Sequence, residues 1–141
     1  MKFSSPKVVM TLKRIAFKKD KCIYLLVANK PIKYQVKRSK VIYIGTTKKG
    51  ASRVSQSVVA RGEPALGKHG ITHIEAFVVL CKPRNKVSIW KKLEAVFILA
   101  FRREYGAVPL YNNKLKYKKR TDEFEYFNEK TIAKTLSKFE R

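Results

Sequence analysis

The stretch CIYLLVANKPIKYQVKRSKVIYIG, residues 22–45, determines most of the architecture that we expect. Residues 22–28 form a compact apolar run, which predicts a buried strand. Residues 41–45 are mostly β-branched or aromatic, and they predict a second strand that ends at its glycine. The polar and basic residues 29–39 between them predict a loop or a wide hairpin connection. Each predicted strand carries one tyrosine.

Hydrophobic periodicity and start and stop signals predict the other elements. The longest periodic segment is expected to begin at a Ser88 cap and to end at Gly106, and Pro109 prevents its continuation. The expected fold is a small α+β domain with three strands, a long central helix and flanking helices. The predicted helices are residues 6–17, 51–61, 86–106 and 128–140, and the third strand is residues 72–80.

Bulk composition narrows the class of protein. A chain of 141 residues, 45% of them apolar, suits a single domain spanning residues 1–141 with its own core. No run approaches the roughly 18 consecutive apolar residues of a membrane span, and the N-terminus lacks the pattern of a secretory signal. Cys22 and Cys81 each lie in an apolar run, which favours reduced, buried thiols. These features predict an intracellular, cytoplasmic protein.

The charge carries the strongest functional signal. Lys and Arg number 33 against 10 Asp and Glu, a net charge of +23. Residues 1–121 hold 29 bases and 5 acids, net +24, whereas residues 122–141 have a net charge of −1. A folded domain with this excess repels itself unless an anionic partner neutralises it. Nucleic acid is the expected partner, because phosphate contacts release condensed counterions, and no basic amphipathic helix with exposed large apolar side chains favours a membrane.

Five residues stand in an order that resembles the GIY-YIG endonuclease family. They are Tyr24 in CIY (22–24), Tyr43 in YIG (43–45), Arg53, Glu94 and Asn112 in PLYN (109–112). That family pairs its two motif-bearing strands, then places an Arg on the next helix, a metal-binding Glu on a later helix and an Asn near the end of the domain. The resemblance covers a nuclease-like core of residues 22–113 and implies a small three-stranded antiparallel sheet flanked by helices. This chain has Cys22 in place of the first motif's Gly, and Ser57 where many members carry a His.

The resemblance implies metal-dependent hydrolysis of DNA phosphodiester bonds. Glu94 would hold one Mg²⁺ or Mn²⁺ ion together with water and substrate phosphate, which is how Mg²⁺ prefers to bind. Arg53 would hold the scissile phosphate. One of the two motif tyrosines would align or deprotonate the attacking water, and a general-base role requires a cation such as Lys33 or Lys48 to depress a pKa ordinarily about 10. Asn112 would be a positioning group.

Further basic residues are expected to track the phosphate backbone. Tyr117, in the basic stretch after the core, is a candidate for stacking on a base. His69 and His73 are four residues apart, but Gly70 lies between them and no Cys or acid completes a ligand set, which disfavours zinc. His69 is a candidate substitute for the helix His. The predicted phosphate-tracking residues are Lys33, Lys48, Lys49, Arg61, Lys114, Lys116, Lys118, Lys119 and Arg120.

Several alternatives stay open from the sequence. Asn113 competes with Asn112 for the final position of the motif set. The substrate is expected to be DNA, with RNA as the alternative. A second function is a non-catalytic, basic nucleic-acid-binding protein, either a degenerate GIY-YIG fold or a ribosome-associated protein. With one site per chain, cutting both strands of a duplex requires a homodimer on DNA or sequential nicking.

Overall fold

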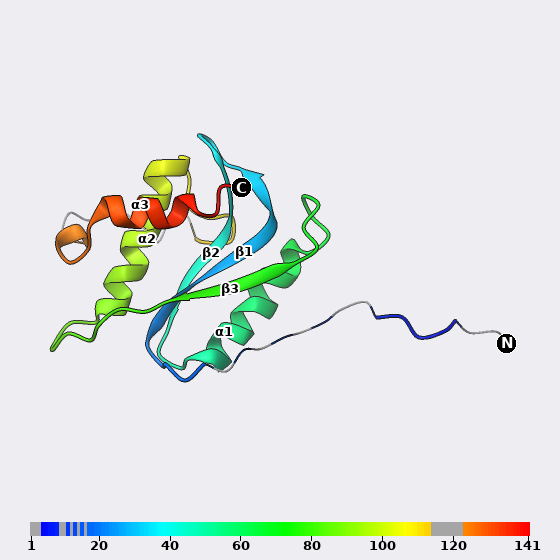
Figure 1. Ribbon diagram of the computed structural model, residues 1–141, viewed down its shortest axis with the longest axis horizontal. Coiled ribbons are helices and arrows are strands. Elements are labelled where there is room, and N and C mark those ends of the chain that lie inside the picture. The colour runs from blue at the N-terminus through cyan, green and yellow to red at the C-terminus, as the bar shows by residue number, and fades with distance from the viewer. Residues whose placement is uncertain (1–3, 9–10, 12, 14, 16, 114–122) are drawn as a thin grey trace.

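The fold is α+β, as predicted, with a three-stranded antiparallel sheet and three α-helices (Figure 1). This computed structural model describes residues 4–8, 11, 13, 15, 17–113 and 123–141. A π-helical turn, Val58–Gly62, continues the first helix, and short 3-10 turns follow at Glu63–Ala65 and Glu123–Glu125. The main elements are β1 (Cys22–Lys33), β2 (Arg38–Thr47), α1 (Ala51–Ser57), β3 (Ile74–Val79), α2 (Ile89–Tyr105) and α3 (Glu129–Ser137).

The strand order is β2-β1-β3, so β1 is the central strand. Its first seven residues, 22–28, are all buried, as the apolar run predicts. The strand continues to Lys33 and pairs with β2 from Arg38. Of the two alternatives predicted for residues 29–39, the hairpin connection is therefore the correct one, and the loop covers only residues 34–37. Ile32 and Tyr34 are buried, and the Tyr34 hydroxyl donates to the Val41 carbonyl oxygen at 2.8 Å. Burial of these two side chains extends the hairpin beyond its apolar core.

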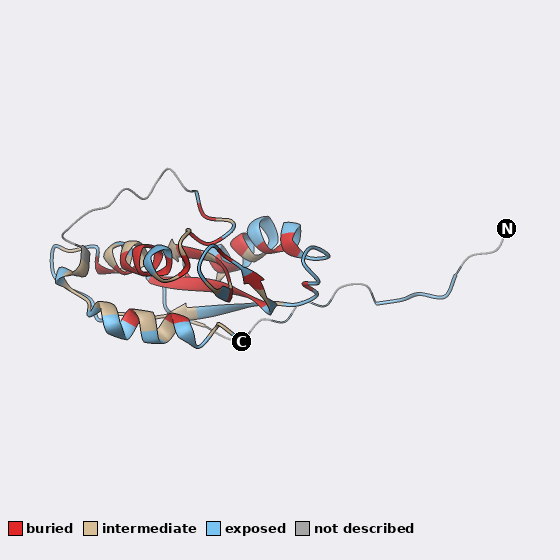
Figure 2. Ribbon diagram, turned by 90° about the horizontal axis from the view of Figure 1, so that it is seen from above, coloured by how far each residue is buried: buried red, intermediate tan, exposed pale blue. Residues whose placement is uncertain are grey.

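The helices lie on both sides of the sheet (Figures 1 and 2). α1 and α2 cover one face, while α3 lies on the opposite side. α2 packs a continuous apolar stripe into the core, including Leu93, Phe97 and Phe101. Ile132 and Leu136 of α3 belong to the same core, which therefore extends beyond the nuclease-like segment expected at residues 22–113.

Cap geometry sets the helix boundaries. α2 begins at Ile89, directly after the predicted Ser88 cap position, although the periodic segment starts at residue 86. Lys86 adopts a left-handed φ of 60°, and residues 84–87 close a tight turn before the helix. Ser88 does precede the helix, but its side chain makes no capping hydrogen bond. Gly106 ends α2 with φ 80°, as expected of a C-terminal glycine. Asn128 caps α3 by accepting from two backbone N–H groups of the first turn.

The prediction of an N-terminal helix at residues 6–17 is wrong for the part of that segment that the structure describes. Those residues are not helical, and Val8 and Ile15 are 85% and 78% exposed. Figure 1 draws residues 4–8 well away from the sheet. A short helix is only marginally stable in water unless its apolar face packs against another surface. Helical periodicity alone is therefore insufficient to predict a helix here. No helix among the described residues is long and apolar enough to cross a membrane.

Candidate active site

The two motif tyrosines and α1 come together on one face of the sheet. The ring centroids of Tyr24 and Tyr43 are 6.0 Å apart, with their planes inclined by 44°. The Tyr24 hydroxyl lies 2.5 Å from Oγ of Ser57, the last residue of α1. Tyr24 is 1% exposed, whereas Tyr43 is only half-buried. Ser57, at the position where a His was expected by resemblance, therefore contacts the tyrosine pair directly.

Burial is the main influence on the Tyr24 phenol. Desolvation raises the pKa of Tyr24 to about 12, and neighbouring Tyr43 adds to the rise, while the Ser57 hydrogen bond and the charge of Arg53 oppose it. Tyr24 is therefore protonated at neutral pH. The cation whose charge lowers the pKa of Tyr24 is Arg53, whereas the sequence suggested Lys33 or Lys48 for this role.

Gly45 lies under the two rings. It is directly opposite Tyr24 in the β1–β2 ladder. A Cβ atom at this position would lie 2.6 Å from Cε1 of Tyr43 and 2.7 Å from Cζ and Oη of Tyr24. These separations are well below van der Waals contact, so only glycine leaves room for both rings. The glycine of the YIG motif is thus required by side-chain packing.

Replacing Gly45 with Ala is expected to destabilise the protein by about 1–3 kcal/mol, because the added methyl group overpacks the site and displaces the tyrosine rings. Urea unfolding of the variant and the parent measures the change. Gly62→Ala is the matched control, since the nearest atom to its Cβ would be the flexible Cδ1 of Ile74, at 3.2 Å, and its effect should stay within about 1 kcal/mol. Equal losses in both variants would contradict a specific packing role for Gly45.

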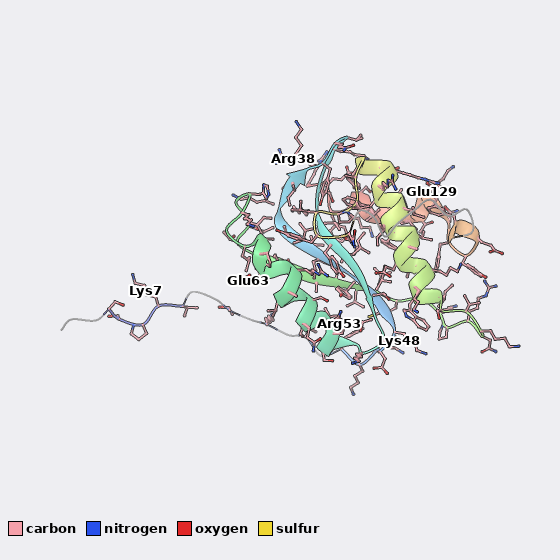
Figure 3. The ribbon with its side chains drawn as sticks, turned by 180° about the vertical axis from the view of Figure 1, so that it is seen from behind. Lys7, Arg38, Lys48, Arg53, Glu63 and Glu129 are labelled. Carbon is pink, nitrogen blue, oxygen red and sulfur yellow. The ribbon has the colours of Figure 1, made fainter. Side chains whose placement is uncertain are left out.

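A basic pocket opens beside the tyrosine pair. It has a volume of about 250 Å³ and is lined by Arg53 and Gln56 of α1 and by the end of β2 and the loop after it, Thr46–Lys49. We call it the Arg53 pocket. Arg53 is exposed, and its Nη1 donates to Gln56 Oε1 at 3.4 Å. Figure 3 shows Arg53 and Lys48 together at one end of the domain, with Arg38 at the far end. Guanidinium, ammonium and hydroxyl groups in one pocket suit a phosphate.

Arg61 adds a second guanidinium to the tyrosine pair. It lies on the π-helical turn that continues α1, and its guanidinium carbon is 5.5 Å from the ring centroid of Tyr43. The spacing of eight residues from Arg53 corresponds to about two helical turns. The sequence places Arg61 at the end of the helix predicted over residues 51–61 and among many phosphate-tracking cations. Nothing local showed that its guanidinium would lie over the Tyr43 ring.

Glu94 lies on α2, the other helix on this face, and is half-buried. Trp90 is one turn before it, and side chains four residues apart share a helix face. The Trp90 ring has Nζ of Lys21 at 4.8 Å and Nζ of Lys48 at 6.0 Å from its centroid. Lys48 also lines the Arg53 pocket. The side of α2 that carries Trp90 therefore lies next to that pocket. The sequence patterns did not single out Trp90.

The acids and histidines present limit which metal fits. Within the described part of the chain, no three His, Cys, Asp or Glu side chains lie close enough to hold an ion. That arrangement does not fit zinc, which takes three or four protein ligands. It fits Mg²⁺ held by Glu94 alone with water and phosphate oxygens. His69 lies in a loop with φ 52°, and exposed His73 is 3.5 Å from Glu75 Oε1.

Asn112 is the buried member of the asparagine pair, whereas Asn113 is exposed. Its Oδ1 accepts from the Ile44 backbone N–H at 2.9 Å, and its Nδ2 donates to the Ile44 carbonyl oxygen at 2.8 Å. Ile44 lies between the tyrosine and the glycine of the YIG motif, on the outer edge of β2. Asn112 thus takes the place of a neighbouring strand and holds this part of β2.

The other predicted phosphate-tracking residues fall into three groups. Lys49 lines the Arg53 pocket together with Lys48. Lys33 pairs with Arg38 at the hairpin tip, nine residues from Tyr24, which places it up to roughly 30 Å along the strand. It is therefore too distant to act on the tyrosines, and that prediction is wrong. Residues 114–120, including Tyr117, lie outside the described residues.

The acidic side chains with resolved ion pairs lie mostly at the other end of the domain. Lys37 bridges Glu104 and Glu140 at 3.0 and 3.1 Å, and Arg103 pairs with Glu129. These contacts tie α2, α3 and the hairpin together. Glu129 lies at the end of the domain remote from Arg53 and Lys48 (Figure 3). None of the described residues that line the Arg53 pocket is acidic, and three of them are basic.

Comparison of the chain with protein families, with curated proteins and with solved structures finds no match.

Proposed function

We propose that this protein is a metal-dependent endonuclease that hydrolyses DNA phosphodiester bonds at a one-metal, GIY-YIG-type site. The convergence of Tyr24, Tyr43 and Arg53 beside a basic pocket supports the proposal most strongly. These residues come from three different elements, β1, β2 and α1. A phosphate in the Arg53 pocket would lie close to the tyrosine pair.

The role proposed for each residue follows from its burial and its charge. Arg53 binds the scissile phosphate and stabilises the negative charge that develops on it. Tyr24 remains protonated, because burial raises its pKa to about 12, so it serves as a hydrogen-bonding group held by Ser57. Tyr43 is the more exposed phenol and is the one that aligns the attacking water. Arg61, over the Tyr43 ring, supplies positive charge to the same place.

Glu94 would hold the single Mg²⁺ or Mn²⁺ ion. When bound, such an ion polarises a phosphate oxygen and offsets charge on the leaving group. By resemblance to the family, cleavage leaves a 5′-phosphate and a 3′-hydroxyl. Asn112 contributes by holding the backbone of β2 between Tyr43 and Gly45.

The second candidate is a non-catalytic nucleic-acid-binding protein. Ser57 in place of a histidine and the raised pKa of Tyr24 favour it, because both remove groups able to accept a proton near pH 7. This candidate retains the Arg53 pocket as a phosphate-binding site. Binding assays therefore do not separate the two functions, whereas cleavage assays do.

Incubating the purified protein with supercoiled plasmid and Mg²⁺ or Mn²⁺ is expected to produce nicked circles, and EDTA to prevent them. Arg53→Ala should lower the nicking rate by about a hundredfold, since it removes a charged group that stabilises the transition state. Arg38→Ala, a cation at the far end of the hairpin, is the matched control and should nick normally. A protein that shifts DNA in gels but never nicks it would rule out the enzyme and leave the binding protein.

A further inference from the structure

A second, larger pocket lies at the start of α2, where the connection from β3 reaches the helix. Its volume is about 480 Å³, within the range of cavities that hold small organic ligands. We call it the Trp90 pocket. Its lining includes Lys21, Cys81, Arg84, Lys86, Ile89 and Trp90.

The lining combines an aromatic face with positive charge. Three of its residues are basic, and none of the described residues that line it is acidic. Lys21 Nζ lies 4.8 Å from the Trp90 ring centroid. Arg84 is held over the ring of Tyr126, 5.1 Å from guanidinium carbon to centroid. A half-buried indole among cations suits a ligand that is flat and aromatic and also anionic, which describes a nucleotide.

The connection that forms the pocket has a defined conformation. Arg84 and Val87 form an isolated β-bridge, and Lys86 between them adopts a left-handed φ of 60°. Such conformations cost energy in residues other than glycine and are concentrated at ligand-binding sites. The turn sets Arg84 and Lys86 in the lining of the pocket before any ligand arrives.

The Trp90 pocket is adjacent to the Arg53 pocket. The Trp90 ring lines the first, and Lys48, 6.0 Å from that ring, lines the second. A strand whose phosphate sits in the Arg53 pocket can therefore place a neighbouring nucleotide against Trp90. In a regular duplex the bases are stacked inside, so only an unpaired or flipped base can reach an aromatic wall.

We propose that the Trp90 pocket binds an unpaired nucleobase of the DNA substrate, stacked on Trp90, with its phosphate held by Lys21, Arg84 and Lys86. This inference rests on the proposed function for its choice of ligand and extends it by naming the substrate class. The preferred substrate is DNA with an unpaired nucleotide next to the scissile bond, such as a flap, a gap or a bulge. Stacking is sequence-tolerant, because every base offers a π-face.

The chain has a single tryptophan, so intrinsic fluorescence reports directly on this pocket. In EDTA, where no cleavage occurs, a single-stranded oligothymidylate of about eight nucleotides is expected to quench Trp90 fluorescence in a saturable manner. A blunt duplex and inorganic polyphosphate, which offer charge without a free base, should bind with much weaker quenching. Equal quenching by polyphosphate would overturn the proposal, since it would show charge recognition without stacking.

Variants test the indole itself through the anisotropy of a labelled oligothymidylate. Trp90→Leu should weaken binding by about tenfold, and Trp90→Phe, which keeps a ring, should lose less. Arg38→Ala is the control for loss of a remote cation. Affinity unchanged in Trp90→Leu would overturn the proposal. Thermal unfolding checks each fold, and the Trp90→Phe variant keeps the comparison valid if the leucine variant unfolds.

Thiol modification gives an independent readout. Cys81 lines the pocket and is partly exposed, whereas Cys22 is fully buried. Bound oligothymidylate is expected to slow modification of Cys81 by a small thiosulfonate, and unchanged modification at saturation would count against the site. None of these measurements uses cleavage. Quenching without nicking would therefore reject only the nuclease, and nicking without quenching would reject only the base pocket.

Discussion

Replacing Glu94 with Gln is expected to lower Mg²⁺-dependent DNA cleavage by about a thousandfold or more, while DNA binding stays intact or becomes tighter. The substitution keeps the shape of the side chain but removes the carboxylate that the proposed ion requires. Binding is retained because the phosphate is held by cations such as Arg53, and losing a negative charge reduces repulsion of the backbone. Single-turnover nicking and gel shifts on the same preparation measure both quantities.

Glu63→Gln is the matched control for the loss of one acid. Glu63 is exposed and follows the helical segment that begins with α1, at the end away from Arg53 (Figure 3). Its replacement should leave the nicking rate within a factor of about two of the parent, because surface changes away from a site have small effects. Undiminished cleavage by Glu94→Gln would show that the ion is held elsewhere and would remove Glu94 from the mechanism.

The largest expected effect on stability is that of Asn112→Ala, a loss of about 2–4 kcal/mol in the free energy of unfolding. Two hydrogen bonds to Ile44 disappear, and each leaves a backbone group unsatisfied at the edge of β2. Because Ile44 is flanked by Tyr43 and Gly45, the tyrosine pair should also lose its geometry. Urea unfolding measures the stability, and nicking should fall in parallel.

Asn113→Ala is the matched control, because it removes the same type of side chain from the next residue of the chain. Asn113 is exposed, so its replacement should change the free energy of unfolding by less than about 1 kcal/mol. A larger loss for Asn113 than for Asn112 would contradict the structural assignment. Comparing the two variants therefore shows, by a stability measurement that does not depend on function, which asparagine holds the backbone of β2.

The central elements were predictable because their signals are local. β1 and β2 follow from runs of apolar and β-branched residues, and α2 from a long helical period ended by Gly106. The helix predicted at residues 6–17 is absent from the described part of that segment for the opposite reason. The hydrophobic period there is helical, but an isolated short helix gains too little stability without a surface to pack on.

For the candidate site, too, some features could be predicted from the sequence and others could not. Tyr24, Tyr43, Arg53, Glu94 and Asn112 were predicted from their order along the chain, and the net charge of +24 over residues 1–121 predicted an anionic partner. Nothing local showed that Arg61 would reach the Tyr43 ring or that Lys33 would lie at the far hairpin tip. Those placements depend on strand register and on the π-helical turn after α1, which bring together residues distant in sequence.

The sequence by itself determined that the domain is α+β, that it is strongly basic, and that two tyrosines lie on successive strands. Only the tertiary structure decided what surrounds those tyrosines. It buried Tyr24 and raised its pKa, and it set Gly45 beneath both rings. It also placed Asn112 where it hydrogen-bonds the edge of β2. Periodicity reports which face of an element is apolar, whereas burial, register and edge contacts exist only once the elements have packed against one another.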